Sequence, residues 1–231
     1  GHIELASPVF HAGFLNKVKK ILECVCTNCG RLKVDSRDRL LYKRIQQIQP
    51  KYRMRHVWEA AKSIMVCEED EGPDENGEPS PPGHGGCGHR QPAIRKEGLK
   101  LFGVYKRAED DDNKKKDFAP SVAERRPMTA QDVHAILKKI SPTDLQWLGL
   151  NAEFARPDWM ILTVLPVPPA PVRPSVTSPG KASAQDDLTY KLADIIKANA
   201  TVQKCEQEGM PSYRTNEYVE LLQYHIATYM D

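Results

Sequence analysis

The sequence predicts an α+β fold that is mainly helical with small β-hairpins, and three observations support this. Several segments place apolar residues three and four positions apart, which is typical of amphipathic helices. Two short stretches are rich in apolar and β-branched residues and end at glycine or proline, as strands do. Polar segments rich in charge, proline and glycine separate these elements, and the chain contains no internal repeat.

The N-terminal half is predicted to contain three helices and a hairpin. The helices cover residues 12–24, 38–48 and 51–65. The first has an apolar face opposite three lysines, and Pro50 separates the second from the third. The hairpin covers residues 92–107, with a tight turn at Glu97-Gly98.

The C-terminal half is predicted to contain four helices and a strand. Thr129 with Asp132, and Ser141 with Asp144, fit capping boxes and predict two consecutive helix starts, the second helix ending at Gly149. The strand covers residues 159–165 and leads into an extended proline-rich segment, 166–179. Two longer helices cover residues 186–201 and 215–230.

Composition divides the chain into segments. A cysteine-containing segment, 1–107, is followed by a polar linker, 108–128, and by a helical segment, 129–231. Within the first segment, residues 68–84 are acidic and then rich in proline and glycine. These residues have almost nothing apolar to bury, so their ordering entropy is not offset and we predict a mobile loop.

The overall charge balance conceals two opposed stretches. The 231 residues carry 33 Lys and Arg against 31 Asp and Glu. Residues 31–55 hold nine basic side chains and two acidic ones, whereas residues 68–78 hold seven acidic ones and no basic one. No apolar run approaches the roughly 18 residues of a membrane span, and the start has neither a signal peptide nor an initiator Met. We therefore expect an intracellular piece of a longer protein.

Six cysteines are too few and too unevenly spaced for a disulfide scaffold, but they suit a metal site. Cys26-Thr27-Asn28-Cys29-Gly30 has the spacing of a zinc knuckle, in which two thiolates can reach one ion and the glycine lets the backbone turn. A tetrahedral site needs two more ligands. The candidates are Cys67 and Cys87, with Cys24, His84 and His89 as substitutes. We expect Cys24 to be a small packed side chain and Cys205 to be structural.

No catalytic constellation is present in the sequence. It contains no glycine-rich nucleotide motif and no paired-carboxylate metal motif. A thiol nucleophile at Cys24 or Cys26 with His11 as its base would lack an orienting acid and an oxyanion motif.

The basic stretch supplies candidate contacts to nucleic acid or to protein factors. They are Arg37, Arg39, Lys43, Arg44, Arg53 and Arg55. Cations of this kind bind phosphate through counterion release, and the scarcity of aromatic residues favours contact with the backbone over base readout. A solvated helix face is the alternative interpretation.

Several blocks of the sequence carry a resemblance to a known family. They are GHIELASPVFH (1–11), CVCTNCG (24–30), MVC (65–67), GGCG (85–88), QPAIRKEGLKL (91–101), RPDWMILTVLPVPPAPVRPSV (156–176), DDLTYKLADIIKAN (186–199) and LLQYHIATYMD (221–231). In this order they resemble the N-terminal clamp region of the largest subunit of eukaryotic RNA polymerase II. The proline-rich block after WMILTVL is the most specific, whereas residues 31–55, 68–84, 106–128 and 177–185 carry no resemblance.

The resemblance implies a zinc-stapled part of the clamp, a mobile element that closes over the DNA–RNA hybrid during template-directed RNA synthesis. It implies Cys26, Cys29, Cys67 and Cys87 as ligands of a structural Zn²⁺. The fragment itself would be noncatalytic, because the Mg²⁺-binding aspartate motif of the parent nucleotidyltransferase, NADFDGD, is absent.

The partners implied are the other RNA polymerase II subunits, DNA and the DNA–RNA hybrid, and initiation and elongation factors, in the nucleus and without a membrane. The alternative is a free-standing zinc-binding adaptor that docks protein or nucleic acid.

Overall fold

The computed structural model describes residues 1–70, 84–105, 124–177, 179–180 and 183–230. The chain forms two compact units. The first, called unit 1, combines Gly1–Leu15 with Met160–Asp231, and the second, unit 2, is Asn16–Trp159. This division differs from the linear segments that composition indicated. The reason is a strand pairing between residues more than 150 positions apart, which joins the two ends of the chain in unit 1.

Unit 1 contains a two-stranded antiparallel sheet. Strand β1 (His2–Phe10) pairs with β5 (Ile161–Pro166), from His2 opposite Pro166 to Phe10 opposite Ile161. The strand expected at 159–165 is thus present but starts two residues later, because Trp159 belongs to a 3-10 helix, η2 (Pro157–Met160). Its partner β1 was not predicted, and the register between the two strands shifts between Glu4 and Val9.

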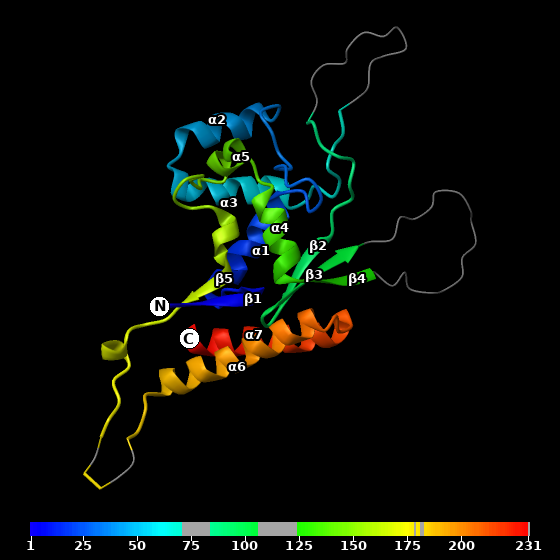
Figure 1. Cartoon of the computed structure of the whole chain (residues 1–231). Coiled ribbons are helices and arrows are strands. Elements are labelled where there is room, and N and C mark those ends of the chain that lie inside the picture. Colours follow the sequence, from blue (N-terminus) through cyan, green and yellow to red (C-terminus); the bar gives the residue numbers. More distant parts are fainter. Residues whose placement is uncertain (71–83, 106–123, 178, 181–182, 231) are drawn as a thin grey trace. The chain divides into compact units, whose positions relative to one another are not determined.

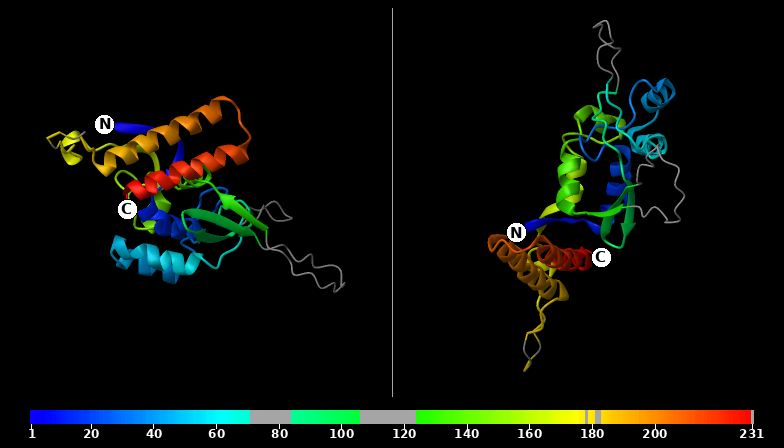
Figure 2. Two further views of the ribbon diagram at one scale, coloured as in Figure 1. Left: turned by 90° about the horizontal axis from the view of Figure 1, so that it is seen from below. Right: turned by 90° about the vertical axis from the view of Figure 1, so that its right-hand side faces the viewer.

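Two long helices complete unit 1. Helices α6 (Asp187–Gln207) and α7 (Ser212–Met230) lie side by side and antiparallel, in orange and red in Figure 1 and from two further directions in Figure 2. The Asp186 carboxylate caps α6 by accepting a hydrogen bond from the Leu188 amide. Both helices are longer than predicted; α6 continues past Thr201 because Val202 and Cys205 extend its buried face.

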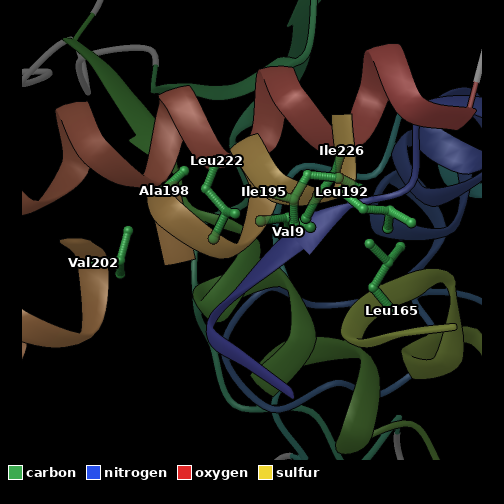
Figure 3. Packing of buried hydrophobic residues seen from close by; sticks show 8 residues of the cluster. All are labelled: Val9, Leu165, Leu192, Ile195, Ala198, Val202, Leu222 and Ile226. Atoms are coloured by element: carbon green, nitrogen blue, oxygen red, sulfur yellow. The ribbon is translucent and has the colours of Figure 1, made fainter. Parts of the chain in front are cut away.

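An apolar cluster holds these elements of unit 1 together, as Figure 3 shows. Its buried members are Val9, Leu165, Leu192, Ile195, Ala198, Val202, Leu222 and Ile226. Two side-chain amides supplement it by binding the backbone of β1. Asn199 accepts from the Ala6 amide at 2.8 Å and donates to the Glu4 carbonyl at 2.9 Å. Gln223 accepts from the Phe10 amide and donates to the Phe10 carbonyl.

Unit 2 combines helices with a three-stranded antiparallel sheet. The helices are α1 (Leu15–Cys24), α2 (Arg39–Gln47), α3 (Pro50–Ala61), α4 (Ala130–Lys138) and α5 (Pro142–Trp147). The strands, in sheet order, are β2 (Ala93–Glu97), β3 (Lys100–Tyr105) and β4 (Glu124–Met128). In Figure 1, α2, α3 and α5 gather at the end of this unit that is away from the sheet.

One of the two predicted capping boxes of unit 2 is complete. Thr129 and Asp132 form a reciprocal capping box at the start of α4. At the start of α5 the Ser141 hydroxyl accepts from the Asp144 amide, but the Asp144 carboxylate accepts from the Leu32 amide. Gly149 follows α5 with a positive φ of 71°. A Cβ atom at Gly149 would lie 1.9 Å from the Pro50 carbonyl oxygen, so this close approach requires glycine.

Two predicted boundaries in unit 2 are wrong. Helix α3 ends at Ala61 and not at residue 65, because the chain then extends toward Cys67. The hairpin turn lies at Gly98-Leu99, one residue later than expected, since Glu97 pairs with Lys100 and Gly98 has a positive φ.

The last five residues of the expected linker 108–128 form β4. The Arg125 guanidinium lies 3.6 Å from the centre of the Phe102 ring on β3, so these charged residues have a partner within the sheet. Residues 106–123 of that linker and 71–83 of the expected loop 68–84 lie outside the described residues.

The proline-rich segment 166–179 is interrupted by a short 3-10 helix, η3 (Ala170–Val172). Among the described residues, no helix is both long and apolar enough to cross a membrane.

Candidate metal centre

Four cysteines of unit 2 meet at one point. The Sγ atoms of Cys26, Cys29, Cys67 and Cys87 all lie within 4.8 Å of one another. The Sγ atoms of Cys26 and Cys87 are 3.6 Å apart, and those of Cys29 and Cys67 are 3.8 Å apart. Four sulfurs placed about 2.3 Å from a central ion in a tetrahedron are separated by about 3.8 Å. The donor set and its spacing therefore fit one tetrahedral metal ion.

The first pair of cysteines is held by a tight loop after α1. The Gly30 amide donates to the Cys26 carbonyl at 2.9 Å, and the Cys26 amide donates to the Arg31 carbonyl at 2.8 Å. Gly30 has a φ of 77°, and a Cβ at this position would lie 2.5 Å from Cβ of Lys139. The glycine of the knuckle is therefore needed for its backbone conformation and for the close approach of α4.

The second pair is held by a short antiparallel pairing between the chain after α3 and the chain before β2. Val66 is bridged to Arg90, and the Cys67 amide donates to the His89 carbonyl at 3.0 Å. The Gly88 amide donates to the Cys67 carbonyl at 2.7 Å. A Cβ at Gly86 would lie 2.6 Å from the Cys67 sulfur. The glycine before Cys87 therefore leaves room for the thiol of Cys67.

Two side-chain amides, which sequence reasoning did not single out, cross between the halves of the centre. Gln91 is 4% exposed and donates through Nε2 to the Cys26 sulfur at 3.1 Å. Asn28 donates through Nδ2 to the Cys87 sulfur at 3.4 Å. No motif would have marked Gln91, because its role depends on a fold that brings it 3.1 Å from a cysteine 65 positions earlier.

The thiols differ in acidity. Burial raises the pKa of Cys67 and that of Cys29. Burial acts in the same direction on Cys87, but hydrogen bonds, first from the Asn28 side chain and then from the His89 backbone, outweigh it and lower the pKa of Cys87 to about 7. N–H groups stabilise a thiolate, which is the form that binds metal. Cys87 is thus the most readily ionised of these three thiols.

The alternative ligands stand outside the cluster. Cys24 is buried beside it, and burial raises the pKa of its thiol to about 12. Cys205 lies on α6 in unit 1. His84 is buried with its Nδ1 2.9 Å from the Asp35 carboxylate, and its Nε2 has no hydrogen-bond partner among the described residues. His89 is exposed, and its backbone carbonyl accepts a hydrogen bond from the Gln91 side chain.

The six predicted basic contact residues separate into two groups. Three are bound within the protein: Arg37 pairs with Asp35 and Glu68, Arg55 pairs with Glu59, and Arg53 donates to the carbonyls of Ile48 and Gln146. The other three, Arg39, Lys43 and Arg44, are exposed on α2 and make no ion pair with any residue that the structure describes. Helix α2 contains no acidic residue.

Comparison with known families accounts for the whole chain. The family described as RNA polymerase Rpb1, domain 1, matches residues 1–231. The chain therefore belongs to this family, which is the N-terminal region of the RNA polymerase largest subunit.

Proposed function

We propose that this chain is part of the clamp of a eukaryotic RNA polymerase II, a zinc-stabilised mobile element that closes over the DNA–RNA hybrid. Membership of the Rpb1 family supports a place in a DNA-directed RNA polymerase, with other subunits and nucleic acid as partners. The sequence blocks that surround the cysteines and the proline-rich segment favour the RNA polymerase II form and a nuclear location. In this proposal the chain supplies no catalytic residue, and catalysis belongs to other parts of the parent nucleotidyltransferase.

The four-cysteine cluster is the observation that carries the structural part of this proposal. Four thiolates at these separations fill all positions of a tetrahedral Zn²⁺, so no position is open for substrate or water. Zn²⁺ would supply folding free energy by linking three places: the end of α1, the chain beyond α3 and the glycine-rich loop before β2. The chain beyond α3 and the glycine-rich loop need such a link, because these two segments bury little apolar surface of their own.

Metal analysis of the purified protein tests the zinc centre. We expect about one Zn²⁺ per chain, lost in Cys67→Ser and Cys87→Ser variants. Cys205→Ser is the matched control, since this cysteine is buried in unit 1. A wild-type zinc content near zero, or serine variants that stay zinc-loaded and as stable as wild type, would contradict the proposal.

The exposed cations of α2 are the proposed contacts to nucleic acid. Arg39, Lys43 and Arg44 are available for phosphate, whereas the contacts of Arg37, Arg53 and Arg55 within the protein make those three supporting residues. Reversing the charges of Arg39, Lys43 and Arg44 should weaken DNA binding by the assembled polymerase. The salt slope should fall by about 0.9 for each phosphate that the variant no longer neutralises. An unchanged slope would contradict this assignment.

Docking of a transcription factor is a second candidate role for the same helix. Leu40, which is 83% exposed on the same helix, would add an apolar contact to such a docking surface. Initiation or elongation factors with an acidic surface and an apolar side chain would suit it. Crosslinking from position 43 in the assembled polymerase separates the two roles, because it captures either DNA or a protein.

A further inference from the structure

We infer that Gln91 and Asn28 form a reciprocal amide brace that positions the thiolates of the metal centre and sets its metal affinity. Asn28 lies in the first cysteine loop and donates to Cys87 of the second, while Gln91 follows the second loop and donates to Cys26 of the first. The inference rests on the zinc centre of the proposed function and assigns positioning residues within it.

Gln91 is suited to this role because both ends of its amide are used. Its Nε2 donates to the Cys26 sulfur at 3.1 Å and to the His89 carbonyl at 2.7 Å. Its Oε1 accepts from the Thr27 amide at 2.9 Å. The buried Gln91 side chain thus contacts Thr27, the residue after Cys26, and His89, two residues after Cys87. It fixes the separation of the two loops as well as the orientation of one sulfur.

The backbone of Gln91 anchors this arrangement. Its amide donates to the Met65 carbonyl at 2.7 Å, two residues before Cys67, and β2 begins two residues later at Ala93. The side chain therefore projects from a short rigid pairing. Preorganised ligands of this kind require less reordering when the metal binds.

Charge gives the second reason for the brace. A divalent ion with four thiolates carries two net negative charges, and charges in a partly buried site are stabilised by hydrogen-bond donors. Cys26 receives two donors, the Gln91 amide and the Asn28 backbone N–H at 3.4 Å. Cys87 receives the Asn28 side chain and the His89 backbone. The side-chain donors are the part of this shell that substitution can remove.

Three variants in the full chain test the inference. Gln91→Glu keeps the size and the Oε1 acceptor but replaces the donor with an oxygen facing sulfur, and Gln91→Met removes both polar atoms. Asn28→Ala removes the weaker donor at an exposed position, where folding is least at risk. Gln46→Glu, an exposed amide on α2, is the matched control.

Zinc affinity, measured by competition with a chelator, is the first readout. We expect Gln91→Glu to lose on the order of 10- to 100-fold in affinity, Asn28→Ala to lose less because its bond is longer, and Gln46→Glu to match wild type. Co²⁺ substitution is the second readout. Removing an N–H donor raises the energy of the sulfur lone pair, so the sulfur-to-cobalt charge-transfer band should move to lower energy in each brace variant.

The outcomes separate the two levels of the proposal. Failure of the wild-type chain to bind zinc overturns the metal centre itself. Wild-type binding, together with unchanged affinity and an unchanged cobalt band in the Gln91 variants, overturns the brace alone. If the Gln91 variants do not fold, Asn28→Ala decides: an unchanged band and affinity in that variant refute the reciprocal brace, and a shifted band supports it.

Discussion

The two units of this protein join distant parts of the chain by different physical means. In unit 1, β1 and β5 are more than 150 positions apart and are held by an apolar cluster that they share with α6 and α7. In the metal centre of unit 2, three segments that are at most 61 positions apart converge on four sulfurs. Only one side chain in residues 62–70, Cys67, is buried. Apolar burial can therefore hold unit 1 without metal, whereas the loops of unit 2 need another source of stability.

Metal removal should produce the largest difference between the units. Structural zinc contributes on the order of 10 kcal/mol in small metal-dependent domains. We expect a strong chelator to abolish hydrogen-exchange protection of the amides of Cys26, Cys67 and Gly88 while leaving α6 and α7 protected. Exchange followed by mass spectrometry measures both units in one sample. Equal loss of protection in the two units would break the comparison.

Acid should reproduce this difference in a graded way. Burial raises the pKa of Cys29 and Cys67, so these thiols hold their protons at neutral pH and must release them when metal binds. Cys87, with its pKa lowered to about 7, joins them as the pH falls below that value. Zinc affinity should therefore decrease as the pH falls, by about tenfold per pH unit for each proton displaced.

The pH dependence is checked by chelator competition between pH 6 and 8. A proton-independent affinity would show that the thiols are already ionised in the metal-free protein. The far-ultraviolet signal of a Cys67→Ser, Cys87→Ser double variant serves as the metal-free control over the same range.

A cavity in the apolar cluster should affect unit 1 alone. Ile195 is 0% exposed and its neighbour Ile196 is 54% exposed, so the two isoleucines form a matched pair on α6. Ile195→Ala should lower the free energy of unfolding by about 2–5 kcal/mol, and Ile196→Ala by much less. Denaturant unfolding of the zinc-loaded chain measures this. A parallel fall in zinc affinity in Ile195→Ala would show that the metal centre depends on the core of unit 1.

Loss of a side-chain amide that binds the backbone of β1 should give the smallest effect. Gln223→Leu leaves the Phe10 N–H and carbonyl without the partners they have in the folded chain. We expect a loss of about 1–3 kcal/mol in the free energy of unfolding. Gln203→Leu, at an exposed position of α6, is the control. Equal stability of the two variants would mean that water replaces the Gln223 amide at no cost.

Local signals made the helices predictable. The caps at Thr129 and Ser141 were identified from residue type and spacing alone, since each depends on contacts within three residues. The turn at Gly98 was found to within one residue for the same reason. By contrast, β1 contains Ser7 and Pro8 within an irregular apolar pattern, and three of the five residues of β4 are charged. Both form strands because each pairs with another strand, β1 with β5 and β4 with β3.

The cysteines show which features local sequence signals predict and which depend on contacts between remote residues. The spacing of Cys26, Cys29 and Gly30 indicated a knuckle, because the loop itself brings both thiols to one side. Sequence reasoning made Cys67 and Cys87 the first candidates, with Cys24, His84 and His89 as substitutes. The family resemblance implied the same pair, and the fold places their sulfurs together. Gln91 could not be predicted as a contact of the metal centre, because a single glutamine before a strand belongs to no sequence motif that indicates such a role.

By itself the sequence determined the helices, the caps at Thr129 and Ser141, the first cysteine loop and the place of the chain in its family. These features depend on contacts between residues that are close in the sequence, or on long matching blocks. Only the tertiary structure decided the pairing of β1 with β5, the division of the basic residues on and around α2, and the amides that reach the sulfurs. Each of these is a contact between remote residues, whose partners depend on how the whole chain closes on itself.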